Sequence, residues 1–187
     1  MKILKRVLIA LLSVGAICCA FFVDLFKFRA SSNIIMYAAE EKLNAIEFFD
    51  MMQKYQGAGT PEALLKYQSN MIILLSLFAA IIAVAVIIII LSTFLKEPKY
   101  TTAVSILGVI GIASSIGMRM AFAPIAKAVE SGTITIGALS GTGFLDSFAK
   151  LDSFILGPAP TDILAIFAVM MLFIMITELF QKNKKKN

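Results

Sequence analysis

The chain lacks the residues on which most catalytic and metal-binding sites depend. It contains no histidine and no tryptophan, and its only two cysteines, Cys18 and Cys19, are neighbours in an apolar stretch. The absence of histidine removes the commonest general base and the commonest metal ligand. Adjacent cysteines are poorly placed to form a disulfide with each other, and an apolar setting keeps thiols protonated. We therefore expect a protein that is not an enzyme and that carries no cofactor and no metal.

The chain is rich in long stretches that contain no charged residue. Hydrophobic residues make up 59% of its 187 residues, and its mean hydropathy is +0.90. The longest uncharged stretch, 71–95, would extend about 37 Å as a helix, which exceeds the roughly 30 Å thickness of the hydrocarbon core of a bilayer. Backbone inside hydrocarbon must be helical or part of a closed barrel. The sequence thus predicts an all-α integral membrane protein.

Four uncharged stretches predict four transmembrane helices in a single domain. Two segments outside the bilayer, 27–68 and 124–160, separate the first span from the second and the third from the fourth. The predicted spans cover about 7–26, 69–95, 100–123 and 161–181. The alternative for the first span is a cleaved secretory signal, because basic residues precede its apolar stretch and small residues follow.

The positions of lysine and arginine predict that both termini are cytoplasmic. The termini and the loop between the second and third spans carry nine basic and two acidic residues, a net charge of +7, whereas the stretches from Asp24 to Asn70 and from Arg119 to Asp162 each carry a net charge of −1. Short cytoplasmic segments rich in Lys and Arg set the orientation of membrane proteins during insertion. The abundance of Ile and Lys favours a bacterial source, and hence the bacterial inner membrane.

The carboxyl-terminal lysines are expected to anchor the chain to lipid. Anionic headgroups attract basic segments next to a transmembrane helix. Binding to nucleic acid is the alternative, but six residues without a fold around them cannot read a sequence. The expected partners are therefore membrane lipids and no nucleic acid. The predicted anchors are Lys182, Lys184, Lys185 and Lys186. Glu178, four residues before Lys182, is spaced for an ion pair at the end of the helix.

The first outer segment is predicted to form a helical layer over the spans. Ser31, Ser32 and Asn33 offer N-cap oxygens. Apolar residues then recur at helical spacing, at Ile35, Ala38, Ala39, Leu43, Ile46 and Phe49. This face would pack on the membrane surface, on the outer ends of the spans or on another subunit. The glycine-rich second outer segment predicts turns, and whether 132–158 dips back into the membrane is left open.

Three charges are predicted to meet near the outer edge of the bilayer. Asp24 follows Arg6 by 18 residues, Arg119 follows Lys99 by 20, and Asp162 precedes Glu178 by 16. At helical rise these separations are about 24 to 30 Å, so the three charges reach one level. The hypothesis is an outer polar cluster of Asp24, Arg119 and Asp162. The alternative is that each side chain reaches the headgroups by itself.

Small residues follow one face of the third predicted span. Ser105, Gly108 and Ser115 lie within a narrow arc, and Gly111 lies at its margin. Small residues allow helices to approach closely in lipid. The face is interpreted as a helix contact within one subunit or, alternatively, as the lining of a seam between subunits or of a narrow pore.

Two functions fit these features. The first is a subunit of a homo-oligomeric membrane assembly, either a small channel or a structural scaffold, because four helices leave little room for a substrate path. The second is an accessory subunit of a larger hetero-complex, such as a transporter, a secretion machine or a bacterial membrane-associated defence system. A solitary transporter is disfavoured, since the chain has no inverted repeat.

Overall fold

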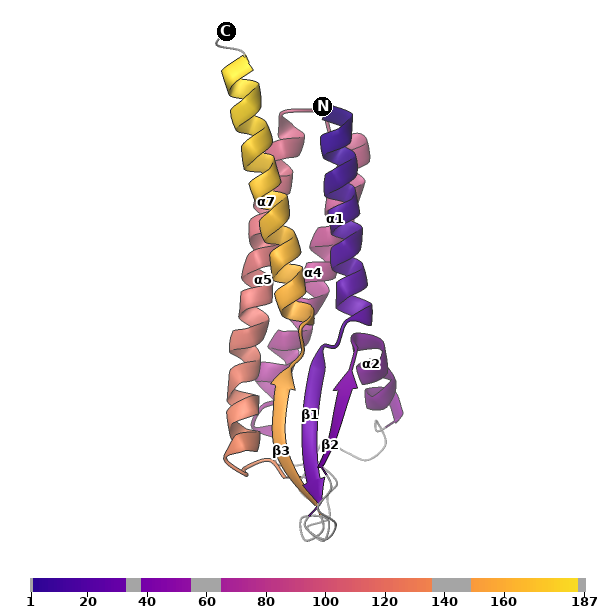
Figure 1. Cartoon of the computed structure of the whole chain (residues 1–187), viewed down its shortest axis with the longest axis vertical. Helices are drawn as coiled ribbons and strands as arrows, with labels where there is room; N and C mark the ends of the chain where they lie inside the picture. The colour runs from indigo at the N-terminus through magenta and orange to yellow at the C-terminus, as the bar shows by residue number, and fades with distance from the viewer. Residues whose placement is uncertain (1, 33–37, 55–64, 136–148, 185–187) are drawn as a thin grey trace.

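Four long helices form the body of the structure, a computed structural model that describes residues 2–32, 38–54, 65–135 and 149–184 (Figure 1). Each helix is long and apolar enough to cross a membrane, as expected from the sequence. Both ends of the chain lie at one end of the bundle, which we call the terminal end. A small β-sheet lies at the opposite end, the sheet end. The four helices are α1 (Lys2–Phe22), α4 (Gln68–Phe94), α5 (Lys99–Glu130) and α7 (Ala159–Lys184).

The third membrane helix is longer than its predicted span of 100–123. Helix α5 continues through Pro124 to Glu130, and with 32 residues it extends about 48 Å. A proline inside a helix removes one backbone hydrogen bond, so tertiary contacts must hold the helix together. Phe122, Ile125 and Val129 are buried and supply such contacts at the sheet end. Helix α5 is therefore longer than the hydrocarbon core is thick, and its last turns pack against strand β3 of the sheet.

The predicted helical layer in the first outer segment is wrong for most of its length. The chain forms strand β1 (Phe26–Ser32) and strand β2 (Ala38–Leu43), and only α2 (Ala45–Lys54) is helical within the described part of this segment. Ser31 and Ser32 lie inside β1, where they do not cap a helix, and Asn33 is outside the described residues. The residue that caps α2 is Asn44 instead. Its side chain accepts a hydrogen bond from the Glu47 backbone N–H, while the Glu47 carboxylate accepts one from the Asn44 backbone N–H.

The sheet joins two segments that lie far apart in the sequence. Strand β3 (Ala149–Leu156) comes from the second outer segment, and the strand order is β2-β1-β3 with both pairs antiparallel. Phe26 in β1 pairs with Leu43 in β2 and with Leu156 in β3. The alternation of apolar and basic residues over 26–29 is the period-two pattern of a half-buried strand.

Aromatic side chains attach the sheet to the helices. The buried ring of Phe26 lies 4.7 Å from Phe48 of α2, 5.6 Å from Phe122 of α5 and 5.5 Å from Phe154 of β3 between centroids. The rings of Phe122 and Phe154 make an edge contact at 4.9 Å. Such pairs add about 0.5–1.5 kcal/mol each beyond their buried area. This cluster explains why the sheet end is a packed layer and not a loose loop.

Helices α1 and α7 pass directly into the two paired strands β1 and β3. At this junction the backbone N–H of Gly157 donates to the carbonyl of Leu25 at 2.8 Å, and that of Ala159 donates to the carbonyl of Asp24 at 3.2 Å. The strand ladder thus continues to the first turn of α7. At the sheet end α1 and α7 are therefore held by backbone hydrogen bonds.

Candidate functional site

Lys5 is an almost completely buried lysine in the first turns of α1, with 2% of its surface exposed. It shares a helix face with Ile9, Ser13 and Ala16, which are also buried and lie three or four residues apart. Burying an ammonium group without partners costs several kcal/mol, so the interior around Lys5 must supply them.

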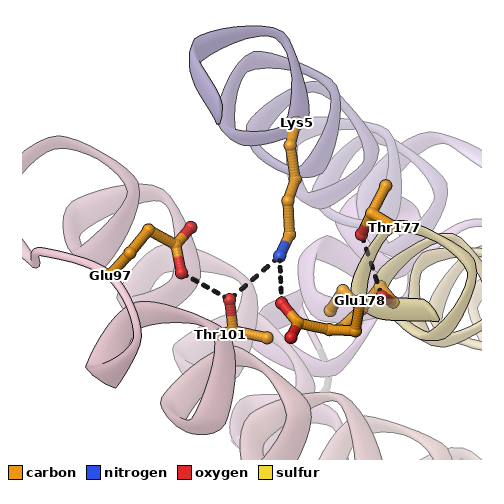
Figure 2. Close-up of polar contacts among 6 residues, drawn as sticks. Lys5, Glu97, Thr101, Thr177 and Glu178 are labelled. Carbon is orange, nitrogen blue, oxygen red and sulfur yellow. Dashed lines mark hydrogen bonds and ion pairs between the residues drawn. The ribbon is translucent and has the colours of Figure 1, made fainter. Parts of the chain in front are cut away.

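Those partners come from two other helices (Figure 2). The Lys5 ammonium donates to the Thr101 hydroxyl of α5 at 2.9 Å and forms an ion pair with the Glu178 carboxylate of α7 at 3.1 Å. The Thr101 hydroxyl in turn donates to Oε2 of Glu97 at 2.6 Å. We call Lys5, Glu97, Thr101 and Glu178 the terminal clasp, because they join α1, α5 and α7 at the terminal end of the bundle.

The two carboxylates of the terminal clasp have different surroundings. The Glu178 side chain is half exposed, with 50% of its surface accessible. Glu97 has its Oε2 atom bonded to Thr101, whereas its Oε1 atom is buried and has no hydrogen-bond partner among the described residues. With both carboxylates ionised and Lys5 protonated, the clasp carries a net charge of −1.

A second set of polar contacts links α4 to α1 and α5 at the same end of the bundle. The guanidinium of Arg6 lies 4.7 Å from the ring centroid of Tyr100, which is fully buried. The Tyr100 hydroxyl is 3.0 Å from that of Ser92 in α4, and Ser92 also donates to the carbonyl of Ile88 at 2.8 Å. Cation–π contacts of this kind contribute about 0.5–2 kcal/mol. All four helices are therefore tied together by polar side chains at the terminal end.

The arrangement is suited to holding helices in place. Within the described ranges, no group of three or more His, Cys, Asp or Glu side chains is placed to bind a metal ion. Removing one member of a buried ion pair leaves an uncompensated charge, whereas replacing the pair by apolar residues is often neutral. On this ground we expect the terminal clasp to select which helices meet more than to add net stability.

The residues of the predicted outer polar cluster lie near the start of the sheet, but no ion pair joins Asp24, Arg119 and Asp162 in the described structure. The Arg119 guanidinium instead donates to the hydroxyl of Thr161, in the first turn of α7. Asp24 contributes its backbone carbonyl to the junction with Ala159. Both Arg119 and Asp162 are exposed.

The small-residue face of α5 lies against α7 of the same chain. A Cβ atom added to Gly108 would lie 2.6 Å from the sulfur of Met171, and one added to Gly111 would lie 2.7 Å from the ring of Phe167. Ser115 is buried and donates to the carbonyl of Gly111 at 2.9 Å, and Ser105 is half-buried. At Gly108 and Gly111, therefore, α5 closely approaches α7 of the same chain.

The predicted lipid anchors lie at the end of the described chain. Lys182 and Lys184 belong to the last turn of α7, and Lys185 and Lys186 lie outside the described residues. Glu178, expected to pair with Lys182, pairs with Lys5.

Sequence reasoning missed the terminal clasp because it treated Lys5 only as a topology signal. A usable signal was present, since Lys5 falls on the same helical stripe as Ser13, Ala16 and Ala20. Glu178 could not be assigned to Lys5 from sequence, because the two are 173 residues apart.

Comparisons with known proteins do not add a family: no family model, no curated protein and no solved structure matches this chain.

Proposed function

We propose that this chain is a structural subunit of a homo-oligomeric assembly in the bacterial inner membrane, with both termini in the cytoplasm. The observation that carries the proposal is an exposed stripe of small side chains on α4. Ser76, Ala79 and Ala83 are exposed and lie three and four residues apart, within the helix that has the highest hydropathy of the four. In lipid there is no hydrophobic drive between helices, and exposed small residues favour close helix–helix packing.

The opposite side of α4 packs against other helices of the same protomer. Leu74, Phe78, Ile81 and Ile88 are buried against the neighbouring helices α1 and α5. The small-residue stripe is therefore available to a helix from outside the protomer. A second α4, related by a two-fold axis along the membrane normal, would present the same stripe, which makes the contact self-complementary.

A scaffold is favoured over a channel through one protomer by the packing between α5 and α7. Phe167 and Met170 are fully buried and occupy the space beside Gly111 and Gly108. Tightly packed apolar side chains exclude a continuous file of water. We therefore expect no ion conduction through the individual protomer in planar bilayers.

The test is the mass of the full-length chain, purified alone and placed in lipid nanodiscs. We expect a defined homo-oligomer, and we expect Ala79→Leu and Ala83→Leu to convert it to monomer. Ala113→Leu is the matched control, because Ala113 is an exposed alanine on α5 outside the stripe. It should leave the mass unchanged.

A wild-type protein that is monomeric in nanodiscs would overturn the proposal and favour the alternative, an accessory subunit that needs a different membrane protein as partner. A homo-oligomer that survives both α4 substitutions would keep the oligomer but reject α4 as the contact.

A further inference from the structure

The strand register separates the side chains of the sheet into two faces of different chemistry. One face carries Phe26, Phe28 and Phe154 and turns toward the helices. The other face begins with Lys27, which pairs with Lys42 of β2 on one side and with Ile155 of β3 on the other. Because β1 lies between the other two strands (Figure 1), these three residues form one row across the sheet.

A second row lies two residues further along β1. There Arg29 pairs with Glu40 of β2 and with Ser153 of β3. Lys42, Arg29, Glu40 and Ile155 are exposed, and Lys27 is half-buried. We call the six residues of these two rows the basic sheet face. With three basic side chains and one carboxylate, this face carries a net charge of +2.

The first row brings two like charges together. Lys27 and Lys42 are direct cross-strand neighbours, an arrangement that destabilises a sheet unless an anion lies nearby. Neither lysine forms an ion pair with a carboxylate among the described residues. The only acidic residue on the basic sheet face, Glu40, lies opposite Arg29 in the second row. The two lysines therefore offer an uncompensated site for an anion.

The position of this row relative to the membrane indicates which kind of anion binds there. Helix α1 ends at Phe22, and Lys27 is the second residue of the strand that follows. The headgroup layer occupies roughly 5–8 Å on each side of the hydrocarbon, within reach of lysine side chains that begin just beyond a membrane helix. Ile155 is 45% exposed in the same row and offers an apolar contact for the upper part of an acyl chain.

We propose that the basic sheet face binds the headgroup of an anionic phospholipid in the leaflet at the sheet end, with Lys27 and Lys42 on the phosphate and Ile155 against the glycerol and upper acyl region. The mixture of two ammonium groups and one exposed apolar side chain fits an amphiphile better than an acidic peptide, which would leave Ile155 in water. Bound lipid neutralises the Lys27–Lys42 repulsion and fixes the sheet at the bilayer surface.

The test uses the full-length chain in nanodiscs made from equal amounts of phosphatidylcholine and phosphatidylglycerol. Native mass spectrometry then gives the ratio of the two lipids that stay bound to the protein. We expect a clear excess of phosphatidylglycerol on the wild type. The double variant Lys27→Gln/Lys42→Gln should lower that ratio, by roughly fivefold for each lysine removed. Lys27→Arg/Lys42→Arg should restore it, which separates a charge effect from a folding defect.

The matched control is Lys96→Gln/Lys99→Gln, which removes two exposed lysines from the other end of the bundle. If the sheet variant leaves the phosphatidylglycerol ratio unchanged, or lowers it no more than this control does, the basic sheet face is not a specific site for the lipid. A wild type that shows no preference for phosphatidylglycerol, but binds a fluorescent polyglutamate peptide in nanodiscs of phosphatidylcholine alone, would replace the lipid by an acidic protein partner.

Discussion

The ammonium group of Lys5 lies 3.1 Å from the carboxylate of Glu178, although 173 residues separate them in the chain. The first and last membrane helices are thus joined at the terminal end by an ion pair. At the sheet end they are joined by the ladder between β1 and β3. Fixing two helices at both ends restrains their sliding and rotation along the whole bundle.

The first prediction concerns the charge balance of this ion pair. Glu178→Gln leaves the Lys5 ammonium buried with no carboxylate at ion-pair distance, so we expect a loss of about 1–3 kcal/mol in stability. This is below the full cost of a broken buried pair because Glu178 is half exposed. Lys5→Met also leaves a carboxylate without its partner, but Glu178 is half exposed and stays solvated, so the loss should be smaller than for Glu178→Gln. The measurement is thermal unfolding of the purified protein in detergent.

The double variant Lys5→Met/Glu178→Gln separates charge from shape. It should recover most of the melting temperature lost in Glu178→Gln, because no unpaired ammonium is left inside. If Lys5→Met destabilises as much as Glu178→Gln, the contact contributes through its own attraction and the specificity argument fails.

The second prediction concerns the close approach of α5 and α7. Gly111→Ala places a methyl group 2.7 Å from the ring of Phe167, and overpacking of this kind costs about 1–3 kcal/mol. Gly15→Ala is the matched control, because its methyl group would lie 3.9 Å from Ile166 in ordinary contact. Thermal unfolding should show a lower melting temperature for Gly111→Ala and little change for the control.

Phe167→Leu should partly rescue Gly111→Ala, since it removes the ring atoms that meet the new methyl group. Measuring both single variants and the double variant isolates their coupling energy. Strict additivity of the two changes would mean that the Gly111 methyl group is accommodated elsewhere and that α5 and α7 are less closely packed than we describe.

The helices and the sheet differ in how far they could be predicted from sequence. The four uncharged stretches predicted the four helices because the thickness of the bilayer sets the length of a span. A stretch of that length can be recognised in one continuous segment of the sequence. The strand at 26–32 was missed because Phe26, Lys27, Phe28 and Arg29 alternate over only four residues, and the serines that follow fit an N-cap equally well. Its partner in β3 lies more than 110 residues away, so no local window contains the pair.

The candidate sites were predicted unevenly for a similar reason. Gly108 and Gly111 could be predicted because small residues on one face of a membrane helix indicate that another helix approaches closely there. This pattern is visible within one short segment of the sequence. That Phe167 and Met171 fill the space beside them depends on the arrangement of α5 and α7, which the sequence does not contain. Lys5 was visible as a charge, but its burial follows from the rotation of α1 within the bundle.

The last prediction concerns the junction between the sheet and the membrane helices, where only glycine fits at position 157. A Cβ atom there would clash with the backbone carbonyl oxygen of Asp24, and the backbone cannot move aside as a flexible side chain does. Gly157→Ala must therefore push β3 away from the end of α1 and weaken the hydrogen bond from Gly157 to Leu25. We expect a loss of at least about 2 kcal/mol in stability.

Hydrogen–deuterium exchange shows where that loss falls. Amide exchange should accelerate in 26–32 and 149–156, whose hydrogen bonds depend on the junction, and should stay slow in the middle of α4, which is remote from it. Gly15→Ala again serves as the control and should leave both regions unchanged. Uniform acceleration over the whole chain would indicate global destabilisation. Unchanged exchange in the two strands would mean that Asp24 and Gly157 are not in backbone contact, and that the sheet is not rigidly continuous with α1 and α7.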